Sequence, residues 1–142
     1  VYEPLLEVEY LVYGSTRHPL QSKNSVSSSD LARHPWVWLT EAVDARRQIA
    51  LAFGKEGLEV PGESISISSL HAGFRIMADN SHLMVLPSTL KRVAGAHGLG
   101  SLRLKPTLGR YVAGLMYRPS LARLSAFSEF RSTLISNVAR LD

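Results

Sequence analysis

The 142-residue chain contains no cysteine. This absence excludes disulfide bridges, thiolate metal sites, iron–sulfur clusters and cysteine nucleophiles. Long apolar runs are also missing, because no stretch approaches the roughly 20 residues that a membrane-spanning helix requires, and the first residues do not resemble a secretory signal peptide. We therefore expect a soluble protein without a membrane partner, and a reducing cytoplasm is the simplest compartment for it.

Motifs for several common chemistries are absent as well. The glycines form neither a G-x-G-x-x-G fingerprint nor a Walker loop, and no two of the five histidines have the i, i+4 spacing of a helical zinc site. No G-x-S-x-G nucleophile elbow occurs. The segment Asp79–His82 gathers polar side chains, but catalytic triads are normally assembled from separated segments, and a polar turn explains this one. We predict no catalytic residue, metal or cofactor; a small α/β hydrolase using Asp79 or His82 is kept as an alternative.

The chain does have the composition of a globular domain with a core, since 45% of its residues are hydrophobic and 20% are charged. Its net charge is +4 but unevenly placed: residues 1–90 carry 7 Lys+Arg against 10 Asp+Glu, whereas residues 91–142 carry 9 against 2. The arginines of the basic third are spaced apart, which favours a solvated face and subunit contacts over direct contact with nucleic acid. Valine at position 1 suggests a piece of a longer protein.

Hydrophobic patterning predicts alternating strands and helices. Val8, Tyr10 and Val12 share one side of a period-2 pattern, whereas the dense run Trp36–Leu39 is typical of a strand covered on both faces. The predicted strands cover residues 7–13, 36–39, 63–68, 83–86, 99–104 and 111–117. The predicted helices cover residues 30–33, 42–53, 70–78, 88–94 and the segment from Pro119, whose apolar stripe extends to Leu141. Ser88 is the predicted cap of the fourth of these helices. This order indicates an α/β fold with a parallel-type sheet.

Polar residues follow two of these strands. Thr40 and Glu41 come after one, and Ser68 and Ser69 come after the next. Parallel α/β sheets bind ligands beyond the carboxyl ends of their strands, where helix N-termini present free N–H groups. The hydroxyl groups are therefore candidates for binding a small anion or carboxylate, and the alternative is that Thr40, Ser68 and Ser69 simply cap the following helices.

Several short motifs occur in a recognisable order. They are HPL at His18–Leu20, DLARHPWVW at Asp30–Trp38, FGKEG at Phe53–Gly57, ISISS at Ile65–Ser69 and LMVLP at Leu83–Pro87. In this order and spacing, the chain resembles the effector-binding domain of LysR-type transcriptional regulators over nearly its whole length. Each motif alone is weakly specific.

The resemblance implies a type II periplasmic-binding-protein-like fold of two lobes, truncated at its N-terminal side. Residues 1–13 would be a returning strand of the first lobe, residues 14–106 one complete second lobe, and residues 107–142 the strand and C-terminal helix of the first lobe. An effector of unknown class would bind between the lobes, at Thr40, Glu41, Ser68 and Ser69, with Tyr13 near the crossing. DNA would be contacted only through an N-terminal domain that this sequence lacks.

The expected function is therefore ligand sensing in a bacterial regulator, by shifting the population of two arrangements, with no covalent chemistry. The resemblance also implies a homo-oligomer, and an uncovered apolar stripe predicts association through the C-terminal helix, the 42–53 helix, or both. A lobe of a periplasmic solute-binding protein, which uses the same fold, is the other alternative.

Overall fold

The computed structural model describes residues 1–61, 64–79 and 81–141. These residues form two compact units: Glu9–Gly109 is one, and Val1–Val8 with the segment from Arg110 onward is the other. The first strand, β1 (Tyr2–Ser15), contributes to both units and is longer than the predicted 7–13. The divisions after Val8 and Gly109 lie close to the predicted segment boundaries, and the assignment of segments to lobes stays a prediction.

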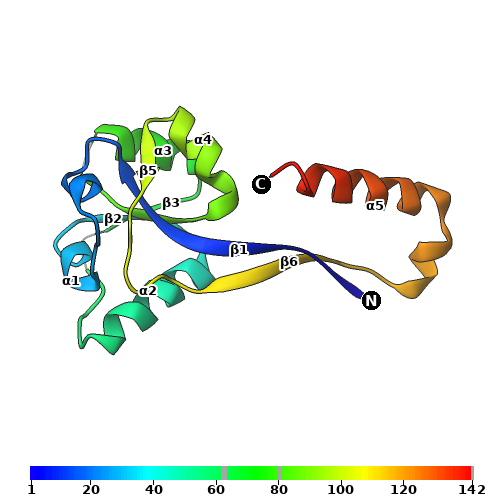
Figure 1. The fold of residues 1–142 in the computed structure, drawn as a ribbon, viewed down its shortest axis with the longest axis horizontal. Coiled ribbons are helices and arrows are strands. Elements are labelled where there is room, and N and C mark those ends of the chain that lie inside the picture. The colour runs from blue at the N-terminus through cyan, green and yellow to red at the C-terminus, as the bar shows by residue number, and fades with distance from the viewer. Residues whose placement is uncertain (62–63, 80, 142) are drawn as a thin grey trace. The chain divides into compact units, whose positions relative to one another are not determined.

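The larger unit is built around a two-stranded sheet and a second sheet, which an isolated parallel bridge joins into one mixed layer (Figure 1). Its strands, besides β1, are β2 (Trp36–Leu39), β3 (Ser64–Ile67), β4 (Met84–Pro87) and β5 (Leu99–Ser101). β2 and β3 pair in parallel, as predicted, and a parallel bridge between Trp36 and Leu83 connects β2 with β4. β1, however, runs antiparallel to both β4 and β5, so the sheet is parallel on one side only. The predicted start of β3 at Glu63 lies outside the described residues.

Alternate residues along the strands supply two separate core clusters. Trp36, Trp38 and Val12 face one cluster, whereas Val37 and Tyr13 face the other. Side chains of a strand alternate between the faces of a sheet, so both faces must be covered to bury these residues. The stacked rings of Trp36 and Trp38, with centroids 5.1 Å apart, form the centre of the first cluster.

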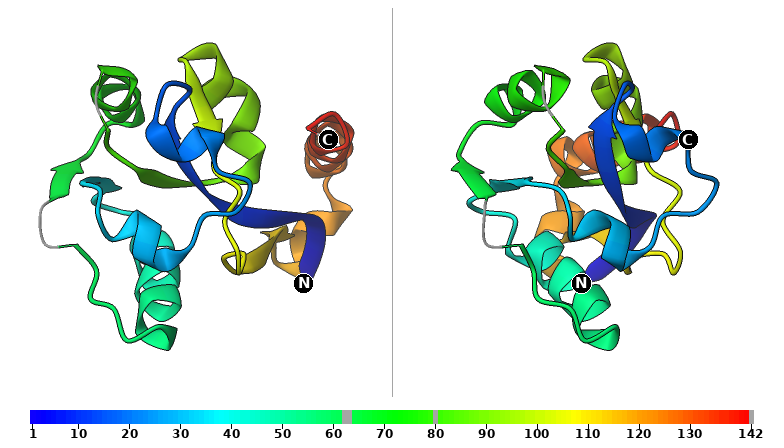
Figure 2. Two further views of the ribbon diagram at one scale, coloured as in Figure 1. Left: turned by 60° about the vertical axis from the view of Figure 1, so that its left-hand side comes forward. Right: turned by 90° about the vertical axis from the view of Figure 1, so that its left-hand side faces the viewer.

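Helices cover both faces of this sheet. α1 (Ser28–Leu31) and α2 (Val43–Lys55) lie on the Trp36 face, and α3 (Leu70–Asp79) and α4 (Lys91–Ala96) lie on the Val37 face (Figure 2). α2 buries Ala45, Ile49 and Phe53, which are spaced four residues apart and so share one side of the helix. The predicted helix 88–94 is divided in the structure, because Ser88–Leu90 forms a 3₁₀ turn before α4 begins.

A buried histidine fixes the irregular connection after β1. His18 is 4% exposed; its Nδ1 accepts a hydrogen bond from Leu20 N at 3.1 Å, so its Nε2 donates to the carbonyl oxygen of Ser81, also at 3.1 Å. Its ring contacts the His34 ring edge-on at 4.5 Å. Burial lowers the pKa of both histidines. The His18-Pro19-Leu20 motif thus joins this connection to the segment that precedes β4.

The smaller unit contains the N-terminal part of β1, the strand β6 (Arg110–Met116) and the helix α5 (Ser125–Val138). Arg131 of α5 makes a paired hydrogen bond with the carboxylate of Glu3, which lowers the Glu3 pKa. The predicted helix start at Pro119 is wrong, because Pro119–Arg123 forms a separate 3₁₀ turn. No described residue of α5 is buried, and Phe130 is 54% exposed.

Candidate functional site

Parallel pairing brings the two predicted polar pairs to one edge of the sheet. Leu39 of β2 lies opposite Ile67 of β3, so the next residues along each strand leave the sheet side by side. Thr40 confirms this arrangement, because its backbone N–H donates to the carbonyl oxygen of Ile67 at 2.9 Å and its hydroxyl donates to the same oxygen at 3.3 Å. We call Thr40, Glu41, Ser68 and Ser69 the strand-end edge; all four residues are exposed.

The two helices that begin at this edge are capped differently. α2 has Ala42 at its N-cap position and no side-chain cap, so the interpretation of Thr40 as a helix cap is wrong. At α3, Ser69 does act as a cap: its hydroxyl oxygen accepts from Ala72 N at 3.4 Å, and its carbonyl oxygen accepts from Gly73 N at 3.2 Å. A serine that accepts from the helix keeps its own hydroxyl proton for another acceptor.

The structure does not bring Tyr13 to the strand-end edge. Tyr13 is 0% exposed and lies opposite Met84 and Ser101 within the sheet, in the core cluster that contains Phe74 and Met77. Burial raises the pKa of its phenol to about 12, so the hydroxyl stays protonated at neutral pH. That hydroxyl has no hydrogen-bond partner among the described residues.

Sequence reasoning missed Ser88 as a neighbour of this edge. The bridge between Trp36 and Leu83 sets β4 parallel to β2, so Ser88 follows β4 at the same end of the sheet. Its hydroxyl accepts from Glu9 N at 3.1 Å, whereas the sequence suggested a helix cap. Only tertiary pairing between β1 and β4 provides this partner, and the sole local signal was a hydroxyl residue after the strand and its proline.

The alternative catalytic segment lies at the other end of β4. Ser81 and His82 precede that strand, and Ser81 contributes its carbonyl oxygen to His18. Asn80 lies outside the described residues. No group of three or more residues able to hold a metal ion occurs within 1–61, 64–79 and 81–141. In the same residues, no helix is both long and apolar enough to cross a membrane.

The strand-end edge therefore presents a mixed set of hydrogen-bonding groups on rigid elements. The Ser68 and Ser69 hydroxyls stand beside the first turn of the ten-residue α3, whose backbone N–H groups carry partial positive charge. Glu41 adds a carboxylate next to Thr40. This arrangement can bind and orient a small polar molecule through donated and accepted hydrogen bonds.

The fold corresponds to a known class of ligand-binding domain. The family model of the LysR substrate binding domain matches residues 1–139. The chain therefore belongs to the LysR substrate-binding domain family, whose fold is of the type II periplasmic-binding-protein kind, and the predicted family is confirmed. No curated protein sequence matches the chain.

Solved structures of low sequence identity share the fold. A candidate transcriptional regulator from Vibrio parahaemolyticus is 19% identical in sequence, with a TM-score of 0.78. The match includes 99% of this chain and 66% of the Vibrio chain. The regulatory domain of CcmR from Synechocystis PCC6803, in complex with 2-PG, is 19% identical with a TM-score of 0.72, and the match includes 97% of this chain and 66% of the CcmR chain. The effector binding domain of QuiR, in complex with shikimate, is 16% identical with a TM-score of 0.64, and the match includes 99% of this chain and 66% of the QuiR chain. The chain thus spans about two thirds of these structures.

Proposed function

We propose that this chain is the ligand-sensing part of a LysR-type transcriptional regulator and that its strand-end edge binds a small-molecule effector. The observation that carries the proposal is the parallel register of β2 and β3, which sets Thr40 and Glu41 beside Ser68 and Ser69 at the start of α3. The CcmR and QuiR structures, which hold 2-PG and shikimate, support small molecules as the ligand type for this fold.

Three residues of the edge are given roles in this proposal. The Ser69 hydroxyl donates its proton to an acceptor on the effector, since its oxygen already serves the helix. The Thr40 hydroxyl donates its proton to Ile67, so its oxygen is left to accept from an effector hydroxyl or ammonium group. Glu41 accepts from the same kind of donor. Tyr13 is enclosed in the core, so it supports the sheet and does not touch the effector.

The mechanism is a shift of population between two arrangements of the regulator. An effector moves this equilibrium only by the difference between its affinities for the two arrangements. No bond is made or broken, so the proposed activity is binding and not catalysis. DNA contact belongs to a separate N-terminal domain, and the regulator acts in the cytoplasm.

Self-association completes the proposal. The apolar stripe of α2 is used by the core, which leaves α5 as the stronger candidate surface. Its exposed hydrophobic side chains include Phe130 and Ile135. Light scattering of the chain at high concentration is expected to show a dimer, and a monomer at every concentration would count against association.

The effector proposal is tested by a thermal-shift screen with small carboxylates, hydroxy acids and amino acids. A compound that binds the folded state raises Tm according to its concentration relative to its Kd. We expect Thr40→Val and Ser69→Ala to reduce this rise for any hit, and Thr133→Val, an exposed threonine on α5, to leave it unchanged. A hit whose Tm rise is the same in all three variants would argue against the strand-end edge.

A further inference from the structure

A segment beside β1 leaves the strand and returns to it. Leu102 N donates to the carbonyl oxygen of Val12 at 2.8 Å, and Tyr10 N donates to the carbonyl oxygen of Gly109 at 3.1 Å. Between these two hydrogen bonds the segment has six residues, 103–108, whereas β1 has one, Leu11. We call residues 103–108 the arch.

The arch is held away from β1 by a second partner. Val26 N donates to the carbonyl oxygen of Arg103 at 2.9 Å, and Lys105 N donates to the carbonyl oxygen of Val26, also at 2.9 Å. These bonds fix the first half of the arch to the segment before α1. A gap therefore persists between the arch and β1, because neither side is free to collapse onto the other.

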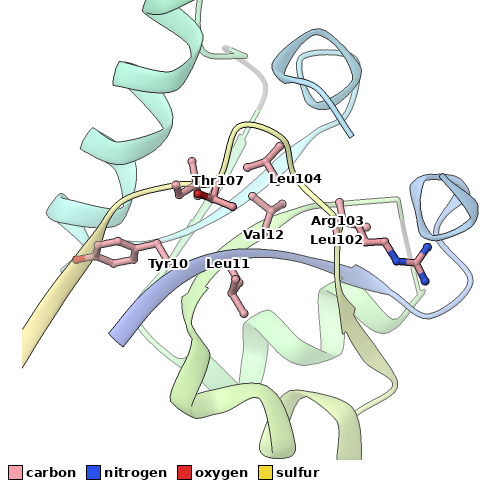
Figure 3. Close-up of a pocket in the computed structure, with 8 residues that line it drawn as sticks. Tyr10, Leu11, Val12, Leu102, Arg103, Leu104 and Thr107 are labelled. Atoms are coloured by element: carbon pink, nitrogen blue, oxygen red, sulfur yellow. The ribbon is translucent and has the colours of Figure 1, made fainter. Parts of the chain in front are cut away.

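The gap is a pocket of about 170 Å³. Its lining comes from β1 and from the arch with its flank: Tyr10, Leu11, Val12, Leu102, Arg103, Leu104, Thr107 and Leu108. In Figure 3, Val12 points from β1 toward Leu104 and Thr107 of the arch. The guanidinium of Arg103 points away, and it donates to the carbonyl oxygen of Lys23 at 3.4 Å.

The pocket is mainly apolar, and of its two hydroxyl residues Tyr10 directs its ring and hydroxyl away from Thr107 (Figure 3). Val12, Leu102 and Leu108 belong to the buried core cluster on the α2 face, so the pocket floor is core surface. Thr107, which is exposed, brings a hydroxyl to the rim. An apolar cavity of about 150 Å³ in another protein stays dry and binds benzene, so the volume here suits one aromatic ring. With the Arg103 guanidinium turned away, the pocket has no charge to balance a carboxylate.

We propose that this pocket is a second ligand site, which takes a single aromatic ring bearing a hydroxyl group. The ring would pack against Leu104 and Leu108, above the buried Val12, and the ligand hydroxyl would exchange a hydrogen bond with Thr107. The site shares no residue with the strand-end edge. Its test is therefore independent of the proposed effector function, and either can fail without the other.

The experiment titrates the 142-residue chain with phenol and with benzene, while the leucine and valine methyl groups are followed by NMR. We expect saturable shifts of the Val12, Leu104 and Leu108 methyl signals, with phenol binding roughly three- to tenfold more tightly than benzene, as one net hydrogen bond provides. Absence of saturable shifts at these methyl groups up to the solubility of both probes would overturn the proposal.

Two substitutions at the rim sharpen the test. Thr107→Phe should fill the pocket and abolish both sets of shifts, while the same change at exposed Thr133 of α5 should leave them intact. Thr107→Val should remove the preference for phenol and keep benzene binding. Unchanged binding in Thr107→Phe would contradict the assigned location. If that variant does not fold, the Thr107→Val comparison decides, because a retained preference for phenol would refute the role of Thr107.

Discussion

Truncation of Ile49 to alanine tests the packing that places the start of α2 beside the strand-end edge. Ile49 is 0% exposed and lies in the Trp36 cluster between Ala45 and Phe53. The change deletes three carbon groups worth about 0.8 kcal/mol each in transfer free energy, or roughly 2.4 kcal/mol. The cavity left behind raises the cost to about 2–5 kcal/mol. The better helix propensity of alanine offsets only a few tenths of a kcal/mol of this loss in stability.

The assay is urea denaturation followed by tryptophan fluorescence. Both tryptophans of the chain, Trp36 and Trp38, lie in this cluster, so the signal reports on the unit that contains α2. We expect the midpoint to fall for Ile49→Ala, without dependence on protein concentration. Leu51→Ala is the matched control, because Leu51 is on the same helix and 51% exposed, and its cost should stay within about 0.5 kcal/mol.

Equal and small costs for the two variants would refute the packing of α2 against the sheet. If the loss of stability in Ile49→Ala depended on protein concentration, the face of α2 that carries Ile49 would instead belong to a subunit contact, which the sequence analysis also allowed.

Further predictions concern titration and buried polar groups. Burial lowers the pKa of His18 and His34, so their contribution to the free energy of unfolding should be fully present above the pKa of an unfolded histidine, near 6.5, and should be lost as pH falls through the folded pKa values. Urea titrations at several pH values should show a flatter profile for His18→Gln. An unchanged slope in that variant would contradict the assignment. Asp30→Ala removes the capping box with Ser27 and the Lys23 pair, and chemical denaturation should show a loss of about 1 kcal/mol at pH 7. The Asp30 pKa of about 2 places the loss of this contribution in wild type between pH 4 and pH 2. Tyr13→Phe deletes a buried hydroxyl without a partner, so stability should rise by roughly 1 kcal/mol and effector-induced Tm shifts should persist; their disappearance would show that Tyr13 has a binding role.

Local patterns were sufficient for most elements of the larger unit. Trp36–Leu39 is dense because both of its faces are covered, and the four-residue spacing of Ala45, Ile49 and Phe53 marks the buried side of α2. The antiparallel direction of β1 was not predicted, because alternation in a strand states which face is buried and does not state the direction of its neighbours.

The candidate site was predicted where it depends on strand register and missed where it depends on tertiary contacts. Thr40 and Ser68 follow paired parallel strands, so their proximity could be inferred from order alone. The Ser88 hydroxyl accepts a hydrogen bond from Glu9 N, which lies 79 residues away in the sequence, and no local pattern predicts such a contact. Tyr13 was placed near the crossing by the family resemblance, yet its side chain lies in the core. The alternative that Thr40 caps the following helix was wrong, because α2 has no side-chain cap.

The central claim, that the strand-end edge binds an effector, is tested most directly by mapping backbone amide shifts of the chain during titration with small carboxylates and hydroxy acids, shikimate included. The account predicts concentration-dependent shifts at Thr40, Glu41 and Ser69 and along the first turn of α3. Binding that shifts only amides away from these residues would contradict it.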